Sequence, residues 1–331
     1  MKTLVTGATG FIGTHLVKAL VEKGRDVRCL VRKTSNTTYL KKLGVELVYG
    51  DLLDRESLID ALKDIDIIHH LASEVYSKKA SDFYRINVVG TKNLLEACTN
   101  KSIKKFIYLS SIAVNGVPNG KRILINEKSP CYPFTPYGKS KLVAENLILS
   151  HFHNGGISVA IIRAPVVYGP GQPYILTKIF HNISKGKTIY IIGNGNNLRS
   201  LCYIDNLIQG MLLAECNTNL SNPVYVISDK KVYTFNEILE AIAEAAKVNI
   251  QKFYLPSFIA DFGKYIFNTL IKVFKVYSLD LYSILTMNID LGCDISKSEK
   301  ELGYKPLINL EEGMKRTFNW YQVNWRLNIE Q

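Results

Sequence analysis

Residues 2–13 read KTLVTGATGFIG, a short apolar run followed by a segment with a glycine at every third position. The run 2–6 predicts a buried strand, and the amphipathic stretch 11–23 predicts a helix. In this context Gly7 permits a tight turn, Gly10 lets the backbone approach a pyrophosphate, and Gly13 lets the helix pack closely on the strand. The N–H groups at the start of the helix would receive the phosphates. The segment therefore predicts a dinucleotide site at the beginning of the chain.

The pattern of strand followed by helix continues beyond this segment. Further strands are predicted at 26–31, 45–49, 65–71, 105–109, 159–163 and 224–227, and further helices at 38–43, 57–62, 87–99 and 140–151. Strands that alternate with helices form a parallel sheet covered on both faces. We expect an α/β fold, a Rossmann-type doubly wound parallel sheet with a smaller, mostly helical C-terminal substrate lobe.

The chain has 331 residues, about two domain-lengths. Near residue 169 the pattern changes to Gly/Pro/Asn-rich loops, at 169–173 and 193–197, that separate isolated helices. We expect residues 1–168 to form the NAD(P)-binding Rossmann domain. Residues of about 203–228 would also belong to this domain. Residues 169–202 and 229–331 would form the substrate-binding lobe.

The composition excludes a disordered chain, because 47% of the residues are hydrophobic and 21% are charged. Lys plus Arg number 41 against 29 for Asp plus Glu, a net charge of +12. Such a surplus suggests an anionic partner: nucleic acid, a membrane surface or a small phosphorylated ligand. Nucleic-acid binding would require a basic stripe with interleaved aromatics, whereas these lysines are dispersed among helices. We therefore expect no nucleic acid partner.

The cysteines and histidines predict neither disulfides nor a metal site. The six cysteines lie far apart and form no CxxC pair, which indicates reduced thiols. His151 and His153 form an isolated HxH without acidic or thiol companions nearby. The start of the chain shows no apolar signal segment or cleavage site, so a cytoplasmic protein is expected.

The second predicted strand ends in basic residues. A fold that binds NAD places an Asp or Glu at this point, on the ribose 2′-hydroxyl. Here Arg32 and Lys33 follow the strand and could instead bind a 2′-phosphate. NADP(H) is therefore favoured and NAD(H) is possible; the alternative is a solvated basic loop.

A tyrosine and a lysine open the predicted helix after residue 135. Thr135 and Pro136 are typical of an N-cap followed by the first helical position. Tyr137 and Lys141 then share one helix face, and a lysine ammonium favours the phenolate form of a nearby tyrosine. Ser111, at the end of the strand before, could hydrogen-bond a substrate oxygen.

With these residues, the chain resembles the extended short-chain dehydrogenase/reductases, and in particular the NAD(P)-dependent epimerase/dehydratase group, over nearly its whole length. The matching segments are TGATGFIG (6–13), GDL (50–52), HLAS (70–73), NVVGT (87–91), RAPVVYGPG (163–171), GNGNN (193–197) with YIDNL (203–207), and SKSEKELGYKP (296–306).

The resemblance implies roles for individual residues. The catalytic triad would be Ser111, Tyr137 and Lys141, and Arg199 would bind the diphosphate of a nucleotide-linked sugar beside Ser111 and Tyr137. The cofactor would contact Gly7, Thr9, Gly10, Phe11, Ile12, Gly13, Arg32, Lys33, Asp51, Leu52, Leu71, Ala72, Ser73, Asn87, Tyr137, Lys141, Pro165 and Val167. A homodimer is also usual for such proteins. The reaction implied is hydride transfer with 4-epimerisation or keto-reduction.

Departures from the family pattern narrow this reaction. Dehydratases of the group carry Asp-Glu after the catalytic Thr, where this chain has Ile112 and Ala113, so a 4,6-dehydratase is not expected. The aromatic residue of the family's VYG is replaced by Asn115. The basic pair at 32–33 is similar to dihydroflavonol-reductase-like and hydroxysteroid-dehydrogenase-like members. An NADPH-dependent ketone reductase acting on an apolar substrate is therefore the alternative. The intact triad disfavours a noncatalytic cofactor-binding scaffold.

Between residues 253 and 281 charges are sparse. Asp261, Lys264, Asn268, Lys272 and Lys275 would form one polar stripe on an otherwise apolar helix. The segment is too interrupted for a membrane span. A helix that covers the substrate pocket or a dimer surface is favoured over one that lies on anionic lipid.

Overall fold

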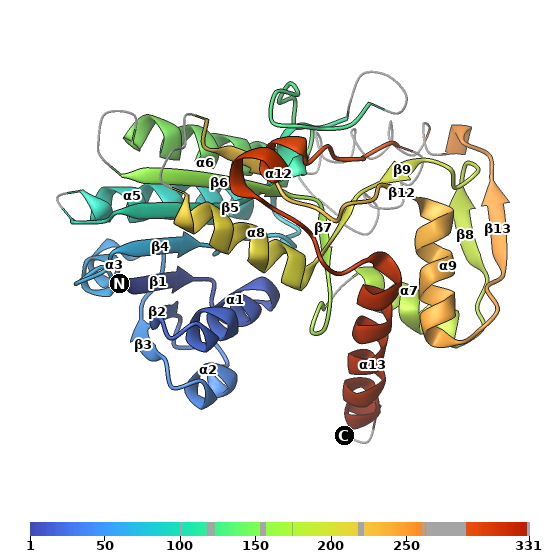
Figure 1. Ribbon diagram of the computed structural model, residues 1–331, viewed down its shortest axis with the longest axis horizontal. Helices are drawn as coiled ribbons and strands as arrows, with labels where there is room; N and C mark the ends of the chain where they lie inside the picture. Colours follow the sequence, from blue (N-terminus) through green and yellow to red (C-terminus); the bar gives the residue numbers. More distant parts are fainter. Residues whose placement is uncertain are drawn as a thin grey trace.

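The computed structural model describes residues 1–99, 101–117, 123–152, 157–173, 175–217, 222–259, 262 and 289–329. Its main element is a seven-stranded sheet in the order β11-β6-β5-β4-β1-β2-β3, on the left in Figure 1. The strands are β1 (Lys2–Thr6), β2 (Asp26–Val31), β3 (Glu46–Tyr49), β4 (Ile67–His70), β5 (Lys105–Ser111), β6 (Ser158–Ala164) and β11 (Val224–Val226). All neighbouring strands run parallel. The predicted strands are confirmed, with ends that move by at most about two residues.

Helices cover both faces of this sheet. Helices α3 (Arg55–Ala61), α5 (Gly90–Cys98) and α6 (Pro136–Phe152) share one apolar core through Leu58, Leu94 and Ile148. On the other face, α1 (Phe11–Glu22) and α8 (Ile204–Cys216) share a second core, and α2 (Thr38–Lys42) packs beside α1. Two separate cores on either side of one parallel sheet define the doubly wound fold that the sequence predicts.

The predicted helix 87–99 begins earlier and is less regular than expected. Helix α4 (Ala80–Tyr84) leads into a π-helical turn (Arg85–Val89), which continues directly into α5. Such turns are rare and often lie at functional sites. Asn87 lies within this turn and is buried.

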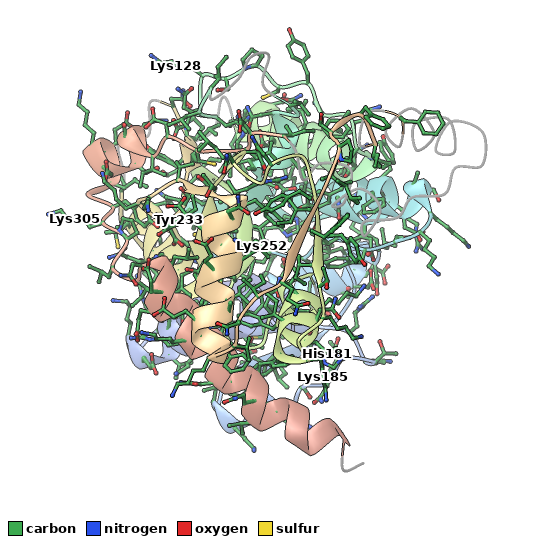
Figure 2. The ribbon with its side chains drawn as sticks, turned by 90° about the vertical axis from the view of Figure 1, so that its right-hand side faces the viewer. Lys128, His181, Lys185, Tyr233, Lys252 and Lys305 are labelled. Atoms are coloured by element: carbon green, nitrogen blue, oxygen red, sulfur yellow. The ribbon has the colours of Figure 1, made fainter. Side chains whose placement is uncertain are left out.

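Most of the remaining elements lie to one side of the main sheet, whereas α12 (Ser296–Leu302) packs against α8 and the edge strand β11 (Figure 1). Together the remaining elements form three two-stranded sheets and four helices among the described residues. The sheets pair β7 (Val166–Tyr168) with β10 (Leu201–Tyr203), β9 (Leu198–Arg199) with β12 (Tyr233–Thr234), and β8 (Ile189–Ile192) with β13 (Lys252–Leu255). The helices are α7 (Ile175–Ser184), α9 (Phe235–Ala246), α12 (Ser296–Leu302) and α13 (Leu310–Ile329). Figure 2 views this side, with Lys252 of β13 and His181 of α7 labelled.

Between these small sheets the chain returns to the main sheet through α8 and β11. The polar stripe predicted at Asp261, Lys264, Asn268, Lys272 and Lys275 lies outside the described residues. Within the described ranges, none of the helices is long and apolar enough to cross a membrane.

Candidate active site

The glycine loop lies at the point where the sheet order reverses, between β1 and β4. Gly7 has φ of 70°, and a Cβ there would approach the Ala72 nitrogen to 2.7 Å. A Cβ on Gly13 would lie 2.1 Å from the Gly7 oxygen. Gly10 is the N-cap of α1 and has no side chain to occupy the first N–H groups. These residues fit a dinucleotide pyrophosphate, whose charge the helix N-terminus would stabilise.

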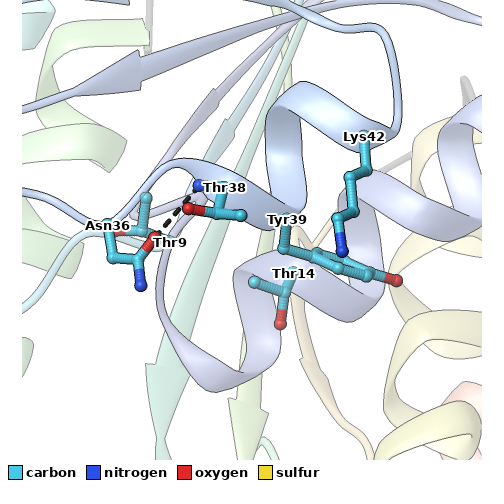
Figure 3. A pocket seen from close by; sticks show the side chains of 6 residues that line it. All are labelled: Thr9, Thr14, Asn36, Thr38, Tyr39 and Lys42. Atoms are coloured by element: carbon cyan, nitrogen blue, oxygen red, sulfur yellow. Dashed lines mark hydrogen bonds between the residues drawn. The ribbon is translucent and has the colours of Figure 1, made fainter.

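Next to this loop lies an open hollow of about 350 Å³ (Figure 3). It is lined by Thr9, Thr14, Asn36, Thr38, Tyr39 and Lys42. Arg32 and Lys33 are exposed in the turn that follows β2, immediately before this lining. The polar lining and the lysine would suit an anionic group.

A buried hydrogen-bonded chain fixes the segment after β4 that was predicted to contact the cofactor. The Ala72 amide donates to Thr6 Oγ1 at 3.2 Å, and Thr6 Oγ1 lies 2.7 Å from His70 Nδ1. On the other side of the ring, His70 Nε2 lies 2.9 Å from Thr91 Oγ1, which donates to the Asn87 carbonyl. Burial lowers the pKa of His70 to about 3, so the ring is a neutral bridge between β1 and α5.

The other predicted cofactor residues occupy different surroundings. Asp51 Oδ1 accepts the Leu53 amide at 2.9 Å, while the Leu52 side chain is buried against Gly90. Pro165 and Val167 lie at the junction of β6 and β7. The polar atoms of Asn87 are all bonded to protein groups. Cofactor contacts of these residues stay predictions.

Ser111 and Tyr137 are brought together at the carboxyl edge of the sheet. Thr135 caps α6 as predicted, since its Oγ1 accepts the Gly138 amide at 3.0 Å. A Cβ on Gly138 would lie 2.4 Å from the Ala113 oxygen, so glycine lets the helix start close to the end of β5. The Ser111 side chain lies near the Tyr137 hydroxyl and lowers the pKa of that tyrosine. Burial nevertheless raises the pKa of Tyr137 to about 12, and the effect of Ser111 only partly opposes this.

Lys141 is buried one turn further along α6 and faces β5. Its Nζ donates to the Leu109 carbonyl at 2.5 Å and lies 4.1 Å from the centre of the Tyr108 ring. Burial lowers the pKa of Lys141 to about 7, opposed by the charge of Glu145. We expected the ammonium to lower the pKa of Tyr137. In this structure that expectation is wrong, because the effect of burial on Tyr137 dominates.

Sequence analysis missed a buried ion pair beneath these residues. Glu145 Oε1 accepts Arg163 Nε at 3.1 Å, and Oε2 accepts Arg163 Nη2 at 2.7 Å. Ser110 Oγ also donates to Glu145, at 2.5 Å. The sequence does contain one indication of Glu145. It follows Lys141 by one helical turn, so both residues lie on the same buried face of α6.

Arg199, predicted to bind a diphosphate, lies in β9. Its backbone pairs with Tyr233 of β12 and bridges to Leu291. Arg199 makes a further interaction within the protein. The diphosphate contact stays a prediction. Among the described residues, no group of His, Cys, Asp and Glu is arranged to hold a metal ion.

Comparison with known proteins decides the family. The model of the NAD dependent epimerase/dehydratase family matches residues 3–255. The chain belongs to this family. Its seven-stranded parallel sheet is the fold of the solved extended short-chain dehydrogenase/reductase epimerases. The protein is thus an enzyme of a family that uses NAD(P), as the sequence predicts.

Relatives of this family member act on different substrates. A 4-hydroxy-2-methyl-3-oxo-4-farnesyl-3,4-dihydroquinoline-1-oxide ketoreductase of Stigmatella aurantiaca is 28% identical, over 95% of each chain. The mouse (Mus musculus) sterol-4-alpha-carboxylate 3-dehydrogenase is 26% identical, over 96% of this chain and 90% of its own. The UDP-glucuronic acid 4-epimerase from Bacillus cereus, solved in complex with NAD, is 27% identical with a TM-score of 0.79, over 98% of this chain and 100% of its own.

Proposed function

We propose that the protein is an NAD(P)-dependent oxidoreductase that moves a hydride at a secondary alcohol or ketone of a nucleotide-linked sugar, as a 4-epimerase or keto-reductase. The observation that carries this proposal is the pairing of Ser111 with Tyr137 at the carboxyl edge of the sheet, above buried Lys141. The likeness to a UDP-glucuronic acid 4-epimerase supports the sugar class.

Each residue would do a distinct task. A bound nicotinamide would accept or return the hydride. In the direction of ketone reduction the Tyr137 hydroxyl donates its proton to the reacting oxygen and becomes a phenolate, and alcohol oxidation is the reverse, in which the phenolate takes the proton back. Ser111 orients the reacting oxygen, Lys141 holds the nicotinamide ribose, and Arg199 takes the diphosphate. Residues 169–202 and 229–331 form the lobe that holds the substrate.

We propose NADP(H) as the cofactor and NAD(H) as the second choice. Arg32 and Lys33 are exposed at the end of β2, and Lys42 lines the neighbouring hollow. Cations at this position stabilise a 2′-phosphate, whereas an NAD site needs an acceptor for the 2′-hydroxyl. We further propose that the enzyme is a cytoplasmic homodimer.

An apolar ketone is the second candidate substrate. The edge formed by β8 and β13 exposes aromatic side chains of Tyr190, Phe253 and Tyr254, and Phe258 lies just beyond it. Exposed apolar patches often mark sites for apolar partners. The farnesyl-quinoline ketoreductase relative supports this alternative.

The nucleotide that copurifies with the enzyme separates the two candidates. A tightly held nucleotide, with conversion of UDP-glucose or UDP-glucuronic acid to its 4-epimer, would establish the epimerase, and the identity of that nucleotide tests the choice of NADP(H). Loosely exchanging NADPH, with reduction of a steroid-like ketone and no effect of UDP-sugars, would establish the alternative. Absence of hydride transfer with both classes would refute the proposed chemistry.

A further inference from the structure

The side chain of Asn87 joins two segments that lie far apart in the sequence. Oδ1 accepts the Glu74 amide at 2.7 Å and Ser73 Oγ at 3.1 Å. Nδ2 donates to the Glu74 carbonyl at 3.0 Å and to Ser140 Oγ at 2.9 Å. These bonds use the full capacity of an amide, which has two donor hydrogens and two acceptor lone pairs.

The orientation of the Asn87 amide is fixed by groups that can act in only one way. The Glu74 amide can only donate and the Glu74 carbonyl can only accept, so they identify Oδ1 and Nδ2 of Asn87 without ambiguity. Ser140 Oγ gives its own hydrogen to the Tyr137 carbonyl at 2.7 Å, and therefore accepts from Asn87. A rotated amide would set donors against donors and acceptors against acceptors.

Asn87 is itself held rigidly. It is 1% exposed and lies in the π-helical turn before α5. Its carbonyl accepts Thr91 Oγ1 at 2.7 Å, and Thr91 bonds to His70 in β4. Asn87 is therefore anchored to the sheet. Its side-chain amide can transmit a displacement of residues 73–74 to Ser140 instead of moving independently.

We propose that Asn87 is a positioning residue that couples the segment 73–74 to the first turn of α6, which carries Tyr137. The inference rests on the proposed function, because it assigns 73–74 to the cofactor side and Tyr137 to proton transfer. Ser73 and both backbone groups of Glu74 hold the amide on one side, and Ser140 links it on the other side to the Tyr137 carbonyl. A bound cofactor that orders residues 73–74 then also restricts the position of Tyr137.

Two variants cut the coupling at different places. Ser140→Ala leaves the clamp on Glu74 intact but releases Tyr137, so we expect kcat to fall about tenfold while the Kd for the cofactor stays within about twofold. Asn87→Ala removes all four side-chain bonds, those to 73–74 and the one to Ser140, so kcat falls and Kd rises. The double variant should have the kcat of Asn87→Ala, because Ser140 acts through Asn87. Ser150→Ala, on an exposed position of the same helix, is the matched control.

Hydrogen exchange tests the coupling without turnover. NADP⁺ or NAD⁺, whichever binds more tightly, should slow exchange at both 72–76 and 136–141 in the wild type and in Ser150→Ala. In Ser140→Ala it should protect only 72–76. Equal protection of 136–141 in Ser140→Ala, or a kcat equal to that of the wild type, would overturn the inference. A variant that lowers only the melting temperature would show a merely structural role and would overturn it too.

The exchange result is independent of the proposed reaction. If the wild type transfers no hydride to either substrate class, the proposed function fails. Hydrogen exchange at 72–76 and 136–141 with bound nucleotide still shows whether the two segments are coupled. If the wild type is active but the segments respond separately, only the coupling fails.

Discussion

Glu145 and Arg163 form a two-point ion pair beneath the candidate active site, with both side chains less than 7% exposed. Glu145 lies one helical turn after Lys141, and its charge opposes the loss of the lysine's proton. A buried charge without its partner is costly, so the pair is sensitive to any change in one member.

Glu145→Gln should lower the free energy of unfolding by about 3 kcal/mol, because it leaves the Arg163 guanidinium buried without a counter-charge. Urea denaturation at neutral pH measures the change. Glu22→Gln is the control, since it breaks the exposed pair of Lys18 and Glu22 at 3.7 Å and should cost less than about 1 kcal/mol. The double variant Glu145→Gln/Arg163→Met should recover part of the loss. An unchanged midpoint for Glu145→Gln would contradict the ion pair.

Lys141 should give the enzyme a pH dependence near neutrality. Its pKa is lowered by burial to about 7, so the ammonium is present below this pH and is lost as the pH rises through it. If the charged form binds the cofactor, kcat/KM falls above pH 7 in the free enzyme. Removing the neighbouring carboxylate in Glu145→Gln lowers the lysine pKa further, so the fall moves to lower pH. A profile that Glu145→Gln leaves in place would assign the titration to another group.

Tyr137→Phe should reduce turnover by about 10²- to 10⁴-fold and leave nucleotide binding intact, since it removes only the hydroxyl that transfers the proton. Steady-state kinetics and fluorescence titration with NADPH measure the two effects. Tyr132→Phe is the matched control because Tyr132 is 74% exposed. Full activity of Tyr137→Phe would exclude this residue from the chemistry.

Arg32→Ala should weaken NADPH binding about tenfold and leave NADH binding nearly unchanged, because a charge-assisted bond to the 2′-phosphate contributes about 1.5 kcal/mol or more. Isothermal titration with both nucleotides gives the ratio. Lys23→Ala, exposed just beyond α1, controls for the overall loss of one positive charge. Equal weakening for NADPH and NADH would show that Arg32 does not select the cofactor.

The sequence predicts those parts of the molecule that depend on local pattern. The apolar runs locate the seven main strands, and Thr135 with Pro136 locates the start of α6, because periodicity and capping are properties of neighbouring residues. The π-helical turn is not predicted, and its residue Asn87 bonds to Glu74 and Ser140, which are distant in sequence.

The electrostatics of the site depend even more on tertiary contacts. The helical spacing predicts that Tyr137 and Lys141 share a face, but not that Lys141 turns to the Leu109 carbonyl and the Tyr108 ring. The depth of burial, which raises one pKa and lowers the other, is set by packing between α6 and β5. The pairing of Glu145 with Arg163 likewise joins a helix to a strand.

Asp229→Asn should stabilise the protein above pH 6. Asp229 is buried, and its carboxylate accepts the Tyr203 amide at 2.8 Å, Asn206 Nδ2 at 2.7 Å and the Tyr168 hydroxyl at 3.1 Å. An asparagine can keep the first two bonds with Oδ1, while Nδ2 donates to the Tyr168 oxygen. The substitution therefore removes a buried charge and keeps three hydrogen bonds, while the Tyr168 hydroxyl hydrogen loses its acceptor, which makes the gain smaller than the removal of the charge alone would give.

The pH dependence identifies this effect. Burial raises the pKa of Asp229 from 3.8 to about 6, so the folded wild type binds more protons than the unfolded chain between these values and loses stability as the pH rises through them. The advantage of Asp229→Asn is then largest above pH 6, at most roughly 3 kcal/mol, and disappears near pH 4. Asp205→Asn, which changes an exposed neighbour of the same chemistry, should show no such trend. Denaturant titrations at several pH values measure the difference, and an advantage independent of pH would mean that Asp229 is already ionised without cost in the folded protein.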